Sequence, residues 1–242
     1  MKSYSDIPLF DRHPLASDLY DDFTEYDSVG RWLFTDTPTG LGNNVAALLA
    51  DGTASAVKLT NEDSANAEGI LATRTAWKIA ANKPLLFESR AKASSAQQAV
   101  FIGHTSGGNS QVFSTASALA GTWSGFGFYK LDLGGYWIFK SNVGATSYGA
   151  NTSKFAVSYS VYQSFRVEVT PISSTVARIT PMVDVLGGDN YAMAYDYTSG
   201  LPVQHELTYS SYVAAYMTFA TSQGSGANTN LCIDSARTRV KR

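Results

Sequence analysis

Short segments in which apolar and polar residues alternate recur along this chain about every ten to fifteen residues, and this spacing strongly limits its fold. In residues 165–169, for example, Phe165, Val167 and Val169 alternate with Arg166 and Glu168. A period of two is typical of a strand that buries one face. Strands are predicted at 55–60, 69–79, 85–93, 99–105, 125–132, 136–141, 165–169, 177–185, 212–221 and 230–240.

Glycine-rich turns separate these segments, at 107–109, 134–135, 187–189 and 224–226. Only residues 43–51 and 94–98 have a pattern that could host a short helical turn. The chain therefore lacks the alternation of strands and long helices that builds a parallel sheet. We expect an all-β fold, an antiparallel β-sandwich of the jelly-roll type.

The 242 residues fit one large β-domain, and no repeat or change in composition divides them. Residues 1–22 differ, because Pro8 and Pro14 favour an extended chain there. We therefore predict an N-terminal arm at 1–22 and one sandwich domain at 23–242. The arm would contact its own domain, a second copy or another protein through apolar side chains: Tyr4, Ile7, Leu9, Phe10 and Leu15.

Charge and cysteine content exclude several classes of partner and site. The net charge of -2 argues against binding nucleic acid or anionic lipid, and no apolar run is long enough to span a membrane. The single Cys232 cannot form an internal disulfide, and its apolar neighbours indicate a buried thiol. Acidic residues crowd the first 27 positions where a secretory signal would be apolar, so we expect no export.

The sequence carries no recognisable catalytic motif. The three histidines lack flanking signatures, and no serine lies in a Gly-x-Ser-x-Gly string. A retaining glycosidase needs two carboxyl groups about 5 Å apart. None of the six glutamates (Glu25, Glu62, Glu68, Glu88, Glu168 and Glu206) belongs to a Glu-x-Asp string, and Glu88 and Glu168 are expected in surface pairs with arginine. We predict that the chain is not an enzyme and has no catalytic residues.

Metal and cofactor motifs are also missing from the sequence. Asp184, Asp189, Asn190 and Asp196 gather around the Gly187-Gly188 turn and could form an oxygen-rich calcium pocket. Residues of these types also make ordinary turns, which is the interpretation we favour. No metal site and no cofactor are predicted.

Aromatic residues stand next to glycines at 123–128 and 134–137, where Trp123, Phe126, Phe128, Tyr136 and Trp137 lie. Such residues fill the core of a sandwich or form platforms that bind sugars or proteins, and we favour the core. The basic C-terminus, with Arg237, Arg239, Lys241 and Arg242, is either a solvated tail or a contact between copies.

Several of these segments carry a resemblance: residues 21–23, 84–90, 101–103, 165–169 and 231–237. They resemble concanavalin A-like (laminin G-like) jelly rolls, in particular those of tailed-bacteriophage virion proteins. In carbohydrate-active relatives, the position of Asp234 contributes to a structural calcium site. The residues near 23–30 do not supply convincing partners for Asp234, so no metal is expected.

The resemblance implies a capsid decoration (cement) protein, a homotrimer that binds the major capsid protein on the virion surface after assembly in the host cytoplasm. Residues 1–22 would then supply contacts to the shell or between subunits. Two alternatives stay open. One is a carbohydrate-binding module or the receptor-binding part of a tail fibre, with a glycan as ligand and exposed Trp and Tyr on a concave sheet face. The other is a degraded glycosidase or polysaccharide lyase.

Overall fold

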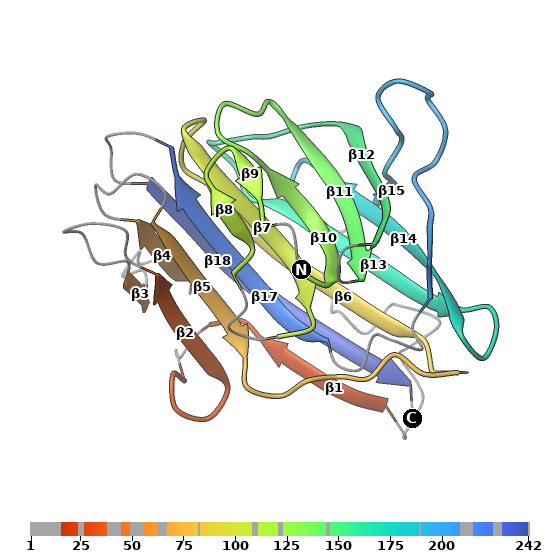
Figure 1. The fold of residues 1–242 in the computed structure, drawn as a ribbon. Helices are drawn as coiled ribbons and strands as arrows, with labels where there is room; N and C mark the ends of the chain where they lie inside the picture. Colours follow the sequence, from red (N-terminus) through yellow and green to blue (C-terminus); the bar gives the residue numbers. More distant parts are fainter. Residues whose placement is uncertain are drawn as a thin grey trace.

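Two antiparallel sheets packed face to face form the molecule, as the alternating sequence pattern predicts (Figure 1). The computed structural model describes residues 16–23, 27–37, 45–48, 56–61, 67–81, 83–107, 111–120, 123–143, 146–188, 190–208, 215–224 and 229–241. Among these residues, no helix has the length and apolar character to cross a membrane. The prediction of an all-β antiparallel sandwich is therefore confirmed.

The larger sheet has nine strands and runs β15-β14-β13-β6-β18-β4-β3, with β1 beside β18 and β16 beside β14. Its strands are β1 (Ala16–Asp21), β3 (Val45–Leu48), β4 (Val57–Asn61), β6 (Leu85–Ala93), β13 (Gln163–Pro171), β14 (Val176–Asp184), β15 (Ala192–Met193), β16 (His205–Thr208) and β18 (Thr229–Lys241). The pairing of β6 with β18 shifts register between Ile233 and Ser235, so Asp234 lies in a bulge.

The smaller sheet has seven strands in the order β12-β11-β10-β7-β17-β5-β2. Its strands are β2 (Trp32–Thr37), β5 (Glu68–Thr73), β7 (Gln98–Thr105), β10 (Gly125–Lys130), β11 (Tyr136–Val143), β12 (Thr146–Ala156) and β17 (Tyr216–Gln223). A separate short hairpin, β8 (Phe113–Thr115) and β9 (Ala118–Leu119), joins β7 to β10.

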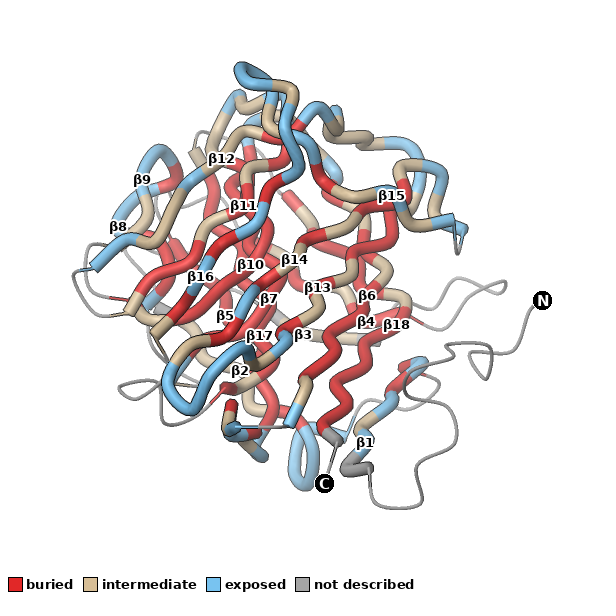
Figure 2. The backbone as a smooth tube through the Cα atoms, turned by 90° about the vertical axis from the view of Figure 1, so that its right-hand side faces the viewer, coloured by how far each residue is buried: buried red, intermediate tan, exposed pale blue. Residues whose placement is uncertain are grey.

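The main core fills the space between the sheets, and the central strands are buried along most of their length (Figure 2). His104 lies inside this core, with its ring 5.1 Å from that of Phe87 and 5.2 Å from that of Phe126. Burial lowers the pKa of His104 to about 3, so the ring is neutral at pH 7. Its Nε2 lies 3.1 Å from the Thr238 hydroxyl.

Three local expectations differ from the structure. Residues 45–48 form strand β3 rather than a helical turn, because they pair with β4. The predicted strand 69–79 ends at Thr73. Glu88 is buried rather than on the surface, and its Oε1 lies 3.6 Å from the guanidinium of Arg166. Alternation alone could not show that both faces of β6 are covered.

The described end of the predicted arm is a strand of the sandwich. Strand β1 pairs along its length with β18, and Asp18 binds Arg237 through two hydrogen bonds of 2.7 and 3.1 Å. Arg239 also lies 3.6 Å from Asp18. Asp18 therefore meets Arg237 and Arg239 within one chain, which corrects the interpretation of these two arginines as part of a solvated tail, while a contact between copies stays a prediction. The five predicted contact residues Tyr4, Ile7, Leu9, Phe10 and Leu15 lie outside the described residues, and their role stays a prediction.

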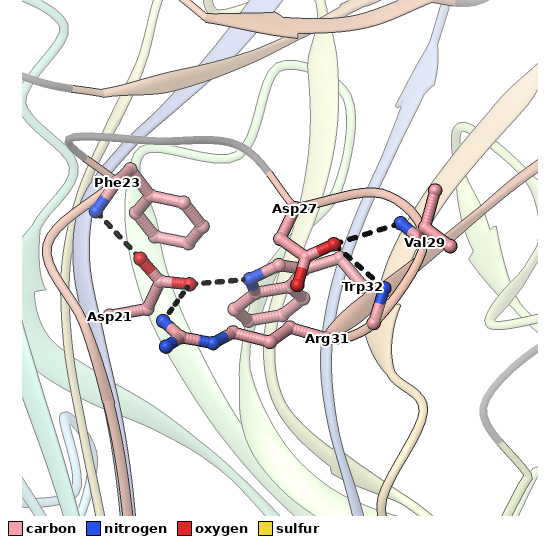
Figure 3. Close-up of polar contacts among 7 residues, drawn as sticks. Asp21, Phe23, Asp27, Val29, Arg31 and Trp32 are labelled. Carbon is pink, nitrogen blue, oxygen red and sulfur yellow. Dashed lines mark hydrogen bonds and ion pairs between the residues drawn. The ribbon is translucent and has the colours of Figure 1, made fainter.

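Asp21 fixes the path of the chain from β1 to β2 (Figure 3). Its carboxylate accepts hydrogen bonds of 2.8 Å from the Phe23 backbone N–H and from the Trp32 indole N–H, and Arg31 lies 3.6 Å away. Phe23 has a φ of 52°, in the left-handed region that is costly for a residue with a side chain. The hydrogen bonds to Asp21 offset part of that cost and place Phe23 and Trp32 in the core.

Replacing Asp21 by alanine is expected to lower the free energy of unfolding by about 1–3 kcal/mol. The substitution leaves the Trp32 indole N–H and the Phe23 N–H buried without an acceptor. Urea denaturation measures the change, and Ser28→Ala, at an exposed position of the following turn, is the control. Equal stability of the two variants would contradict the role assigned to Asp21.

Candidate ligand-binding site

The outer face of the seven-stranded sheet divides into a covered part and an open part. Residues 111–120 and Trp123, here called the cover, lie over β5, β7, β10 and β17 (Figure 1). They form a second core with the sheet, whose buried members are Ile70, Ala72, Ala99, Phe101, Val112, Phe113, Ala116, Trp123, Tyr129 and Ala220. The central part of this face is therefore closed by the chain itself.

Glycines in β10 let aromatic rings lie close to the backbone of the sheet under the cover. Trp123 packs edge-on against Phe101, with ring centroids 5.2 Å apart. A Cβ at Gly127 would stand 2.8 Å from the tip of the Phe101 ring, which is too close for any side chain. Gly127 therefore leaves room for the Phe101 ring, and Gly125 does the same for the Trp123 ring.

Glu68 fastens the cover to β5. Its Oε1 accepts hydrogen bonds from the backbone N–H groups of Val112, at 2.9 Å, and Phe113, at 3.0 Å. The side chain is buried, and its Oε2 has no hydrogen-bond partner among the described residues. Burial raises the pKa of Glu68 to about 7, although the two backbone N–H donors act in the opposite direction.

Glu68 is the one carboxyl side chain on the described outer face of this sheet. Asp36 on β2 belongs to the inward-facing set of Trp32 and Phe34, and no other described strand of the sheet contains an acidic residue. A retaining glycosidase would need a second carboxyl about 5 Å from the first. Glu68 is also occupied with two backbone N–H groups, and the described residues of this face contain no second carboxyl to pair with it.

The open part of the face lies over β11 and β12, where Tyr136 and Tyr197 form a pair. Their ring centroids are 5.0 Å apart with an interplanar angle of 54°. Tyr136 is 39% exposed and Tyr197 is 54% exposed. The neighbouring side chain of Tyr197 raises the pKa of Tyr136.

Lys154 and Tyr195 stand beside this pair. Trp137 and Phe139 point into the core, so Tyr136 points outward from β11. On β12, Ser153 is buried and Phe155 packs against the core, so Lys154 between them lies on the same outer side as Tyr136. We call Tyr136, Lys154, Tyr195 and Tyr197 the tyrosine face. In Figure 2 the rim around β12 and β15 is tan and blue, in contrast to the red central strands.

Backbone pairing holds residues 195–202 against the edge strand β12. The Lys154 N–H donates to the Tyr195 carbonyl at 3.0 Å, and the Tyr197 N–H donates to the Thr152 carbonyl at 2.7 Å. Asp196 then closes a turn by accepting from the Thr198 and Ser199 N–H groups. These hydrogen bonds stabilise the ionised carboxylate and lower the pKa of Asp196 to about 2. The bond from the Ser199 N–H is the largest cause.

A series of hydrogen-bonded polar side chains, buried at its inner end, anchors this segment to both sheets. Asp196 accepts from Asn151 Nδ2 at 3.1 Å, Asn151 Oδ1 lies 2.7 Å from His205 Nε2, and His205 Nδ1 lies 2.7 Å from the Ser141 hydroxyl. A Cβ at Gly149 would stand 2.5 Å from His205 Nε2, so only glycine fits there. Burial lowers the pKa of His205 to about 4. Ser141 is fully buried, so this Ser-His contact is structural and has no opening for a substrate.

A groove adjoins the tyrosine face where β12 ends. Its volume is about 400 Å³, within the range of small-molecule sites. Lys154 lines both the groove and the tyrosine face. The remaining lining is mainly apolar and consists of Phe155, Ala156, Val157, Ser158, Val161, Gln163, Val185 and Leu186.

The acidic residues that were considered for calcium and that the structure describes have partners within the chain. Asp184 accepts from the Leu186 and Asn190 N–H groups, as the turn interpretation predicts, while Asp189 lies outside the described residues. Asp234 binds Arg90 at 2.6 Å. Among the described residues, no group of three or more His, Cys, Asp or Glu side chains is placed to hold a metal ion.

The remaining candidates are mostly core residues. Trp123, Phe126, Phe128 and Trp137 are buried, as favoured from the sequence, and Cys232 is a buried free thiol. Tyr136 is the exception. Tyr195, Tyr197 and Lys154 were missed by the sequence analysis. Three tyrosines within residues 191–197 were the available signal, but only the pairing of that segment with β12 sets two of them beside Tyr136.

Several solved structures have an architecture similar to that of this chain. The carbohydrate recognition domain of Emp47p matches with a TM-score of 0.55 and 12% identity over 91% of this chain and 93% of its own. Peanut lectin, solved with a nine-residue peptide, matches with a TM-score of 0.56 and 13% identity, over 93% of this chain and 97% of its own. An endo-1,3-β-glucanase from Streptomyces sioyaensis matches with a TM-score of 0.58 and 14% identity, over 94% of this chain and 97% of its own. The chain has the concanavalin A-like lectin and glucanase fold.

This result confirms the fold that the sequence resemblance implies. No family model and no curated protein matches the sequence. At these identities the similarity shows the fold alone, and the fold is shared by lectins and glucanases. A choice between them must come from the side chains of this chain.

Proposed function

We propose that this chain is a non-catalytic sugar-binding domain and that the tyrosine face with its groove is the binding surface. The observation that carries the proposal is the exposed, tilted pair Tyr136 and Tyr197 beside a groove of about 400 Å³. Tyrosine offers a ring for the apolar side of a sugar and a hydroxyl for its polar groups. The similar structures, which include lectins, support this choice.

The rigid support of the tyrosine face also favours binding. Residues 195–202 are held in place before any ligand arrives. Backbone pairing with β12 and the hydrogen bonds that link the side chains of Asp196, Asn151, His205 and Ser141 hold them. A preformed site loses little conformational entropy on binding. The closed central face, with Glu68 as the one carboxyl among its described residues, supports a binding function rather than glycoside hydrolysis.

Replacing Tyr197 by alanine is expected to weaken sugar binding about tenfold, because one ring of the pair is lost. A glycan array on the intact chain identifies ligands, and calorimetry with the strongest of them measures the affinity. Tyr20→Ala is the matched control, since Tyr20 is an exposed tyrosine on β1 of the other sheet. Unchanged affinity in Tyr197→Ala, or no glycan bound at all, would refute the proposal.

Capsid decoration is the second hypothesis, and the sequence resemblance supports it. It requires a homotrimer, binding to the major capsid protein and contacts from the arm. Mass photometry of the full chain and of a chain that lacks residues 1–15 tests the arm while keeping β1 in its sheet. A trimer that dissociates without residues 1–15 would favour this hypothesis, and monomers in both cases would count against it.

A further inference from the structure

We infer that the tyrosine face selects acidic sugars and that the carboxylate of the sugar pairs with Lys154. This inference rests on the proposed sugar-binding function and names the class of ligand. It is drawn from the charges around the face, from the position of the lysine and from the lining of the groove.

The described surface around the tyrosine face has two lysines, and its one nearby carboxylate, that of Asp196, is hydrogen-bonded within its own turn and to Asn151. Strands β11 and β12 contain two lysines, Lys140 and Lys154, and no Asp or Glu. Lys140 alternates with the core residue Phe139 and so lies on the outer side with Lys154. In the part of the chain that the structure describes, no carboxylate oxygen lies within 4.0 Å of the Lys154 ammonium.

Asp196 is the one acidic residue in the segment that carries Tyr195 and Tyr197. Its Oδ1 accepts from the Thr198 and Ser199 N–H groups, and its Oδ2 accepts from Asn151. The carboxylate is therefore committed to the turn rather than to Lys154. The lysine is left with its hydrogen-bonding capacity available to a ligand.

Lys154 is placed between the two parts of the surface. Its Nζ lies 3.5 Å from where a Cβ at Gly200 would stand, next to the segment of Tyr195 and Tyr197. The same residue lines the groove. A carboxylate at Lys154 would therefore have a tyrosine ring on one side and an apolar hollow on the other. That groove, which is lined by Val157, Val161 and Leu186, offers apolar contacts to an N-acyl group of the same sugar.

Calorimetry on the full chain with four probes tests the inference: 3′-sialyllactose, its neutral carboxamide, lactose and tri-galacturonate. We expect 3′-sialyllactose to bind at least tenfold more tightly than the carboxamide and lactose. Lys154→Gln should remove this preference and its dependence on salt, Lys154→Arg should retain it, and Lys78→Gln, an exposed lysine elsewhere, should change neither.

The outcomes separate this inference from the proposed function. Equal binding of the sialyl probe and its carboxamide, with both weakened in Tyr197→Ala, would leave sugar binding in place and overturn acid selection. Binding of tri-galacturonate as tightly as 3′-sialyllactose would support the carboxylate contact and overturn the use of the groove by an N-acyl group. Retained preference in Lys154→Gln would overturn the role of Lys154.

Discussion

Replacing Trp123 by alanine is expected to lower the free energy of unfolding by about 3–5 kcal/mol, the range for a buried aromatic side chain. Trp123 is among the largest fully buried residues, although it lies on the outer side of the seven-stranded sheet. Its ring packs against Phe101 and over Gly125, so its loss leaves a cavity under the cover. Urea denaturation followed by circular dichroism measures the change.

Ser117→Ala is the control for this measurement, because Ser117 is an exposed residue of the same cover. It should change stability by less than about 0.5 kcal/mol. A loss in Trp123→Ala as small as that in Ser117→Ala would show that the cover contributes little to stability. The central face of the sheet would then be accessible to a ligand, contrary to the structure.

Glu68 is expected to make stability fall as the pH rises from about 4.5 to about 7. Its pKa is raised from 4.5 to about 7 in the folded chain, mainly because the carboxyl is buried. Below pH 4.5 the group is protonated in both states, and its contribution is fully present. As the pH rises through the folded pKa, the unfolded chain ionises more readily, and this contribution is lost.

Glu68→Gln should remove this dependence on pH, because glutamine keeps an oxygen for the Val112 and Phe113 N–H groups and stays neutral. Because the pKa of Glu68 shifts from 4.5 to about 7 on folding, the free energy of unfolding of the variant should rise relative to that of the parent chain by up to about 3 kcal/mol between pH 4.5 and pH 8. Urea denaturation at steps of pH measures both chains.

The comparison must be made as a difference between the two chains. His104 and His205 have pKa values lowered to about 3 and about 4, so each reduces stability as the pH falls below 6.5. Their effect is opposite to that of Glu68 and equal in both chains, so subtraction removes it. A difference that stays constant from pH 4.5 to 8 would contradict a buried, neutral Glu68.

The secondary structure followed closely from the sequence where one strand face is buried and the other is polar. Strand β6 has the predicted bounds 85–93, and β13 extends the predicted 165–169 by two residues at each end. In these segments local alternation gives the bounds of the strand, although in β6 it did not show that the second face is also covered. The hairpin β8–β9 was not predicted, because its strands are only three and two residues long.

The sequence by itself determined an all-β antiparallel sandwich, since period-two alternation and glycine turns are local properties of the chain. Tertiary structure alone decided which sheet face is closed and which is open. Glu68 meets Val112 across 44 positions, and Tyr136 meets Tyr197 across 61. Such contacts depend on how strands distant in sequence pair, and no local pattern records that pairing.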